Sequence, residues 1–229
     1  MHKSAVCTAF LHTIPVMTGY LFLGFGFGIY LNENGYGLLW ALCMSLFIYA
    51  GSMQYVAVSL LTGGASLITA ALTTLMVNAR HLFYGISMLD TYKTTGKQKP
   101  YLIFSLTDET YSLVSQNQVP EGVSRNAYFL LVSLFDQCYW VAGSVLGSVA
   151  GNWIPINYEG IDFVLTALFV TIFVEQWLSN KDHTPALVGF VGTALCLLLF
   201  GKDIFLIPSM VLIAVILTVA QKQKEVSHV

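Results

Sequence analysis

An arginine and a histidine, Arg80 and His81, lie in the middle of an otherwise apolar stretch that runs from residue 66 to residue 89. A helix of that length can cross a bilayer, because the hydrocarbon core is about 30 Å thick and each residue adds about 1.5 Å. A cation inside such a helix costs on the order of 3 kcal/mol and needs a polar partner or an aqueous cavity. The pair therefore predicts a membrane protein with a polar site in its interior.

Composition favours an all-α polytopic membrane protein. Hydrophobic residues make up 56% of the 229 residues and charged residues only 10%, whereas about 25% of the residues in a soluble domain are charged. The net charge of −2 offers no basic surface for nucleic acid. The four cysteines form no C-x-x-C pair, and the motifs of membrane proteases and serine hydrolases are absent. We therefore predict no metal site, no cofactor and no enzyme activity.

Seven apolar segments are expected to be transmembrane helices, and they run near 9–31, 38–61, 66–89, 127–150, 161–178, 185–200 and 204–220. Segment 101–119 differs, because Asp108 and Glu109 lie at its centre. Two charges in a lipid-facing helix would be costly, so we expect a broken or re-entrant helix there. The chain is thus predicted to be one transmembrane transporter domain, residues 1–229, with about seven spans.

The positions of lysine and arginine distinguish seven spans from eight. If 101–119 crosses the membrane, five basic residues lie inside and four outside, with Arg80 set aside as intramembrane. If it does not cross, seven lie inside and two outside. The seven-span arrangement is therefore predicted, with the N-terminus outside and both the 90–100 loop and the C-terminus in the cytoplasm.

An internal repeat accompanies this topology. In each copy two glycines at four-residue spacing precede an apolar run that ends in a glutamine: Gly24, Gly28 and Gln54 in the first, and Gly147, Gly151 and Gln176 in the second. The first helices of the two copies would enter from opposite sides, which predicts an inverted repeat with halves 9–89 and 127–220, joined by 90–126. The alternative is that such glycines only let membrane helices pack closely.

The polar residues of helix 66–89 are candidates for a substrate site. Asn78 and His81 share one face, and Arg80 and Tyr84 form the adjacent strip. Arg80 either binds substrate or only joins helices, and in both cases we expect a carboxylate partner, because an intramembrane charge must be paired. The candidate partners are Asp108, Glu109 and Asp136.

Two further helices carry candidate residues. Helix 127–150 has a stripe of polar and small residues that includes Trp140, with Asp136 beside it, and this face could line a pathway or pack against another helix. The glycine-rich first helix is expected to be kinked or unwound, which would free backbone N–H groups near Gly24 and Gly28 to bind a carboxylate. Close packing is the alternative there. The candidate proton carriers are His81, Asp108, Glu109 and Asp136.

Four blocks of sequence resemble the AzlC family, the large subunit of bacterial branched-chain amino acid exporters. They are Ala50-Gly51-Ser52-Met53-Gln54, Asn78-Ala79-Arg80-His81-Leu82-Phe83-Tyr84-Gly85, Thr107-Asp108-Glu109-Thr110-Tyr111, and Gly160-Ile161-Asp162-Phe163 with the residues that follow it. The resemblance implies a multi-pass protein of the bacterial cytoplasmic (inner) membrane that exports amino acids together with a small AzlD-like membrane subunit.

The predicted function is secondary-active, proton-coupled export of branched-chain and similar apolar amino acids such as methionine. The alternative is a non-transporting scaffold or channel in which the Arg80 cluster is structural. The amino acid would present a carboxylate to Arg80, Asn78 and the N–H groups of Gly24–Gly28, and an ammonium to Asp108, Glu109 or Gln54. Its side chain would be enclosed by Phe47, Phe83, Tyr84 and Trp140.

Overall fold

The computed structural model describes residues 5–115, 119, 122–153, 166–167, 170, 173–174, 177–178, 182–201 and 205–226. Within these residues every regular element is a helix, which confirms the predicted all-α class. The chain divides into two compact units, Met1–Leu165 and Thr166–Val229, which are considered separately.

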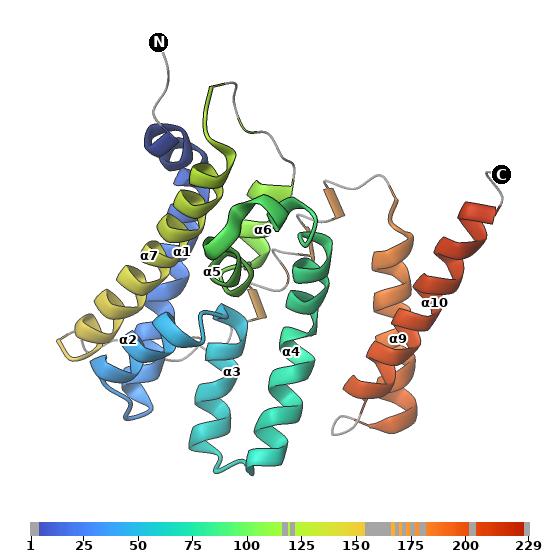
Figure 1. Cartoon of the computed structure of the whole chain (residues 1–229). Coiled ribbons are helices and arrows are strands. Elements are labelled where there is room, and N and C mark those ends of the chain that lie inside the picture. The colour runs from blue at the N-terminus through green and yellow to red at the C-terminus, as the bar shows by residue number, and fades with distance from the viewer. Residues whose placement is uncertain are drawn as a thin grey trace. The chain divides into compact units, whose positions relative to one another are not determined.

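Two long helices, α1 (Ala5–Glu33) and α7 (Arg125–Gly151), lie side by side in the first unit (Figure 1). Each is long and apolar enough to cross a membrane. Near one end of the pair His12 of α1 forms a hydrogen bond with Tyr128 of α7, and further along Tyr20 of α1 contacts Trp140 of α7. Residue numbers therefore increase in the same direction along both helices. The helices are therefore parallel. The prediction that the helices beginning at 9 and 127 enter from opposite sides is wrong.

Glycine allows the backbones of α1 and α7 to touch. A Cβ atom on Gly28 would overlap the backbone of Ser144 and Ser148, and one on Gly147 would overlap the backbone of Phe25. A Cβ on Gly24 would lie 3.0 Å from the backbone of Ser144. The four-residue glycine spacing thus serves close helix packing.

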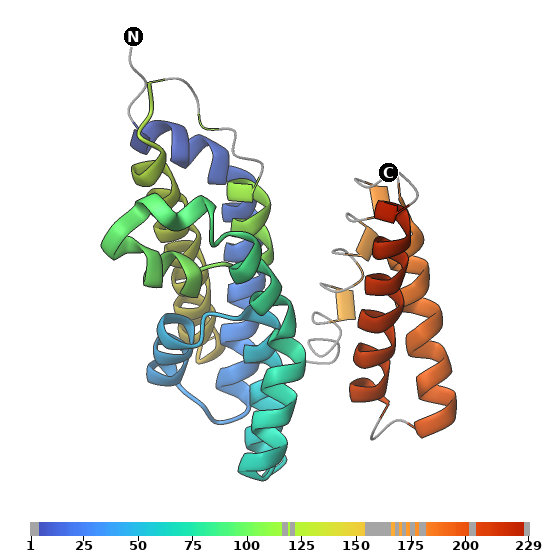
Figure 2. The same ribbon diagram turned by 45° about the vertical axis from the view of Figure 1, so that its right-hand side comes forward.

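The first helix is bent but not unwound. Pro15 lies inside α1, and Figure 2 shows the first, dark blue turns at an angle to the rest. Proline removes one helical hydrogen bond and clashes with the preceding turn, which bends a helix. The expected kink is confirmed, whereas the expected unwinding near Gly24 and Gly28 is wrong, because both glycines lie in a continuous helix.

The apolar stretch 38–61 forms a helical hairpin and not a single span. Its two arms are α2 (Leu38–Phe47) and α3 (Gly51–Thr62), and between them Tyr49 adopts a φ of 43°. The Gln137 side chain donates to the Leu46 carbonyl near the tip, and the Tyr30 and Ser59 hydroxyls lie 3.2 Å apart near the end of α3. Both ends of the hairpin lie at the end of the unit where α1 finishes (Figure 1).

A second hairpin enters from the other end. Residues Thr91–Gln98 form an irregular 3₁₀ segment, followed by α5 (Lys99–Phe104) and α6 (Asp108–Ser115). The helix is interrupted between Phe104 and Asp108, so the prediction that 101–119 is broken is confirmed. The rings of Tyr49 and Phe104 lie 6.3 Å apart. The tips of the two hairpins therefore meet inside the unit.

Helix α4 (Leu67–Ser87) runs opposite to α1 and α7 and connects the two ends of the unit (Figure 1). Its 21 residues span about 30 Å at 1.5 Å each. Leu72, Leu75 and Leu82 are exposed, as expected for the face opposite the polar strips. Of the four predicted spans in this unit, three are single long helices and the fourth, 38–61, is the hairpin.

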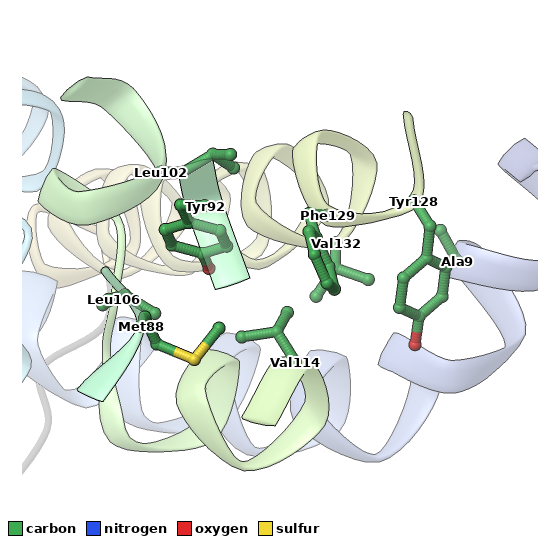
Figure 3. Close-up of a cluster of buried hydrophobic side chains, with 9 residues drawn as sticks. All are labelled: Ala9, Met88, Tyr92, Leu102, Leu106, Val114, Tyr128, Phe129 and Val132. Atoms are coloured by element: carbon green, nitrogen blue, oxygen red, sulfur yellow. The ribbon is translucent and has the colours of Figure 1, made fainter. Parts of the chain in front are cut away.

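A cluster of buried hydrophobic side chains fixes which segments share one end of the unit (Figure 3). It joins Ala9 of α1, Tyr92 and Leu102 of the segment after α4, Val114 of α6 and Phe129 of α7. The start of α1 and the 90–100 loop are therefore on the same side. The prediction of an external N-terminus with a cytoplasmic 90–100 loop is wrong, because the two cannot be separated. Segment 90–126 was expected to link two halves, and its residues Tyr92, Leu102, Leu106 and Val114 belong to this core.

The second unit contains α9 (Thr184–Phe200) and α10 (Leu206–Val226), which pack against each other. They match the segments predicted at 185–200 and 204–220. Most of segment 161–178 lies outside the described residues, as do Gly160, Gln176 and the Gly160–Phe163 block. The seven-span count and the inverted repeat are not confirmed, because 38–61 is a hairpin and α1 and α7 run parallel. The single transmembrane domain stays a prediction.

Candidate functional site

Arg80 of α4 joins the tips of the two hairpins. Its Nη1 lies 2.5 Å from Asp108 Oδ2, and its Nη2 donates to Ser52 Oγ at 2.7 Å. Ser52 belongs to the first turn of α3, and Asp108 is the first residue of α6. The predicted ion pair between Arg80 and one of three carboxylates is confirmed, with Asp108 as the partner.

The electrostatics of this junction favour an anion. Two helices, α3 and α6, begin at the guanidinium, and a helix N-terminus carries a partial positive charge. The carboxylate of Asp108 offsets this positive potential, and a ligand carboxylate has the same charge and shape. Arginine also suits such a ligand because its planar group donates two parallel hydrogen bonds.

The junction also offers hydrogen-bond acceptors. Asp108 Oδ1 and Asn78 Oδ1 are buried and have no hydrogen-bond partner among the described residues. The side chains of Arg80 and Asp108 are 27% and 16% exposed, so the ion pair is not sealed from its surroundings. An ammonium group carries three N–H donors and can pair with an unsatisfied oxygen of this kind.

Aromatic rings flank the polar strip of α4. The Tyr84 ring stacks on Tyr111 of α6 at 4.5 Å, and the His81 ring meets Tyr84 edge-on at 5.9 Å. Tyr84 and His81 are half-buried. Phe47 and Phe83 were expected to enclose the substrate side chain, but they are 75% and 66% exposed. They therefore do not form an enclosed pocket together with Arg80.

Gln54 and Trp140 form a separate buried pair. Trp140 Nε1 donates to Gln54 Oε1 at 2.8 Å, and Gln54 Nε2 donates to Ser45 Oγ at 3.4 Å. A Cβ on Gly51 would lie 2.9 Å from the Trp140 ring, so glycine allows the ring to approach the start of α3. Because both ends of the amide are engaged and Gln54 is fully buried, the pair fastens the α2–α3 hairpin to α7.

The two remaining acidic candidates are held by hydroxyl groups. Glu109 accepts a hydrogen bond from Tyr20 of α1 at 2.6 Å, and Asp136 of α7 accepts one from Thr110 at 2.7 Å. Sequence reasoning did not single out Tyr20. A signal was available, since Tyr20 lies four residues before Gly24 and therefore shares the face of α1 that packs against α7.

Groups of three or more His, Cys, Asp or Glu side chains that could hold a metal ion do not occur among the described residues. The arrangement instead combines one guanidinium, one carboxylate with an unsatisfied oxygen, the unsatisfied amide oxygen of Asn78, and aromatic rings. It can bind a small molecule that carries both an anionic and a cationic group beside an apolar part.

Comparison with known proteins places the chain in a family. The model of the AzlC protein family matches residues 15–154. The chain is 45% identical over 99% of its length to a Bacillus subtilis protein named "Branched-chain amino acid transport protein AzlC", of which 89% is covered.

More distant relatives include an uncharacterized membrane protein of Helicobacter pylori, 42% identical over 98% of this chain and 100% of that protein. Another is the Escherichia coli inner membrane protein YgaZ, 28% identical over 89% of this chain and 84% of that protein. No solved structure matches the chain. The matched residues include Ser52, Arg80 and Asp108, and the chain belongs to the AzlC family of membrane proteins.

Proposed function

We propose that the protein is a secondary-active exporter of branched-chain amino acids, acting in the bacterial inner membrane. The observation that carries the proposal is the Arg80–Asp108 ion pair at the junction of two hairpin tips. Broken helices that meet inside the membrane are a common way to build a substrate site in transporters. The name of the Bacillus subtilis relative supports the substrate class.

An amino acid zwitterion fits the groups at the junction. Its carboxylate would bind Arg80 and the start of α3, and its ammonium would bind Asp108 Oδ1 and Asn78 Oδ1. Tyr84 would contact the hydrocarbon part. One methylene changes binding in an apolar site by only about 1–3 kcal/mol, so selectivity among leucine, isoleucine, valine and methionine is expected to be loose. Gly24, Gly28, Gln54 and Trp140 support the site without contacting the substrate.

The basic residues suggest an orientation. Lys93, Lys97 and Lys99 precede or begin α5, and Arg125 begins α7, so all four lie at the end where α1 starts. The described loops at the opposite end, 34–37 and 63–66, contain no lysine or arginine. By the positive-inside rule, the start of α1 and the 90–100 loop face the cytoplasm.

Labelling of single cysteines in a cysteine-free background tests this orientation. Asn34→Cys should react with an impermeant maleimide added to intact cells, whereas Thr94→Cys should react only after lysis. The seven-span arrangement instead places residue 34 in the cytoplasm. If Asn34→Cys does not react with the maleimide in intact cells, the result supports the seven-span arrangement and overturns the orientation proposed from the basic residues.

The AzlC resemblance further suggests a small AzlD-like membrane subunit as the partner, and export coupled to protons. Both belong to the proposal and can be tested together. Flux of radiolabelled leucine should be measured in proteoliposomes with and without the co-expressed partner, and with and without a pH gradient. Stimulation by each is expected.

The site itself is tested by Asp108→Asn in well-folded protein. Leucine flux should fall at least tenfold, because the ammonium loses its counter-charge and Arg80 its partner. Asp90→Asn is the matched control, since Asp90 is exposed and pairs with Lys93, and its flux should equal that of the wild type. Wild-type flux in Asp108→Asn would instead favour the scaffold or channel interpretation.

A further inference from the structure

Five side chains form a continuous hydrogen-bonded chain beside the Arg80 junction, and we call it the hydroxyl chain. Tyr20 Oη lies 2.6 Å from both Glu109 Oε2 and Thr107 Oγ1. Thr107 Oγ1 lies 3.0 Å from Thr110 Oγ1, which lies 2.7 Å from Asp136 Oδ2. Three hydroxyl groups therefore connect two carboxyl groups that come from α6 and α7.

The number of protons in the hydroxyl chain is fixed by its chemistry. Four hydrogen bonds need four protons, and the hydroxyls of Tyr20, Thr107 and Thr110 supply one each. The backbone N–H of Thr110 also donates to Thr107 Oγ1 at 3.2 Å, but that proton stays on the peptide nitrogen. The fourth proton must therefore come from a carboxyl group.

Burial also favours four protons in the hydroxyl chain, and therefore one protonated carboxyl group. Tyr20, Thr107, Thr110 and Asp136 are all buried, and two ionised carboxylates in such a space would repel each other while losing hydration. The titratable groups that interact electrostatically with Asp136 are Tyr20, Tyr49, Tyr101, Glu109 and Tyr128. Those that interact with Glu109 are Tyr20, Tyr49, Tyr84, Asp108, Asp136 and Arg80. The Arg80 charge is balanced by its ion pair with Asp108.

The geometry points to a single proton shared by Glu109 and Asp136 and relayed by the hydroxyl chain, in which Tyr20 of α1 connects Thr107 to Glu109. In one state Asp136 is protonated, every hydroxyl donates toward Glu109, and Glu109 is ionised. In the other state every hydrogen bond is reversed.

Conversion between the two states breaks the O–H bond of Asp136 and forms one on Glu109. Each hydroxyl accepts one proton and releases its own, and nothing is oxidised or reduced. Because Glu109 follows Asp108 in sequence, arrival of the proton lowers the negative charge beside the Arg80 ion pair. This last link, between the proton and the substrate site, rests on the proposed function.

Infrared spectroscopy of the purified full-length protein tests the shared proton without any transport. The wild type should show the C=O stretching band of a protonated carboxyl group at neutral pH. The band should disappear in Asp136→Asn and in Glu109→Gln, because the new amide N–H supplies the fourth proton and leaves the other carboxyl ionised. It should persist in Asp108→Asn. A band that survives in both of the first two variants would overturn the proposal.

Transport tests the role of Tyr20. Its ring packs edge-on against Trp140 at 5.4 Å, so Tyr20→Phe keeps the packing and removes only the hydroxyl. Net leucine transport driven by a pH gradient should fall at least tenfold, while leucine counterflow, which needs no net proton movement, should stay within twofold of the wild type. Undiminished gradient-driven transport in Tyr20→Phe would refute the relay.

Tyr55→Phe is the matched control, because the Tyr55 hydroxyl is also engaged, at 2.8 Å to the Leu23 carbonyl, but lies outside the hydroxyl chain. Both of its transport rates should equal those of the wild type. If the wild type moves no leucine in either assay, the proposed function fails, and the infrared result still decides whether the proton is shared.

Discussion

The pair α1–α7 and the helix α4 are held in different ways. Helices α1 and α7 contain nine and ten buried residues, whereas α4 contains none. Glycines bring the backbones of α1 and α7 into contact, while α4 is held to both hairpin tips through the polar contacts of Arg80. Interdigitated backbones resist displacement, but a polar contact can be exchanged for a ligand. We infer that α1–α7 is the fixed frame of this unit and that the contacts of α4 are the ones a ligand can replace.

The largest destabilisation is expected when a methyl group is added at the contact between α1 and α7. Gly28→Ala and Gly147→Ala place a Cβ against backbone atoms that cannot move aside. We expect destabilisation of about 3 kcal/mol or more, seen as loss of the monodisperse peak in size-exclusion chromatography. Gly19→Ala in the same helix is the control, because nothing lies within 4 Å of its Cβ position.

Side-chain burial should separate the two regions as well. Phe129 of α7 is fully buried, whereas Phe83 of α4 is 66% exposed. Phe129→Ala should cost about 3–5 kcal/mol, and Phe83→Ala should change stability by less than about 0.5 kcal/mol. Thermal unfolding in detergent measures both. Equal losses of melting temperature would mean that α4 is packed as tightly as α7.

Removal of both charges of the Arg80–Asp108 ion pair should destabilise the protein less than removal of one. Arg80→Gln and Asp108→Asn each leave a partly buried charge without its partner, at a cost of up to about 3–5 kcal/mol. The double variant should recover most of this stability and still fail to transport leucine. A double variant that is no more stable than either single variant would show that the pair does not fasten α4.

The smallest effect is expected at the exposed ion pair Asp90–Lys93, whose side chains are 86% and 72% exposed. The hydrogen bond and positive charge of Lys93 hold the pKa of Asp90 below its usual value. A lowered pKa adds stability above the usual pKa, and this is lost as the pH falls through the lowered one. Because solvent screens the pair, Lys93→Gln should barely change the melting temperature at neutral pH and not at all in acid.

The sequence predicted the features that depend on local chemistry. The charges of Asp108 and Glu109 marked the break in 101–119, and the cost of an unpaired Arg80 required a carboxylate nearby. The break at Tyr49 escaped prediction, because 38–61 is largely apolar and contains no proline and no charged residue. Helical periodicity shows which face of a helix is packed but not the partner or its direction. The parallel contact of α1 with α7, and with it the place of Tyr20, therefore required the structure.

The contact between α1 and α7 also sets an order of events during synthesis. His12 and Tyr128 are 116 residues apart, and Thr13 and Tyr139 are 126 residues apart. A ribosome that adds roughly 5–20 residues per second needs on the order of 6–24 s to cover that distance. During this time the glycine face of α1 lacks its contact with α7. The complete contact between α1 and α7 can form only after the ribosome has synthesised α7, so α1 is made well before the helix that it packs against.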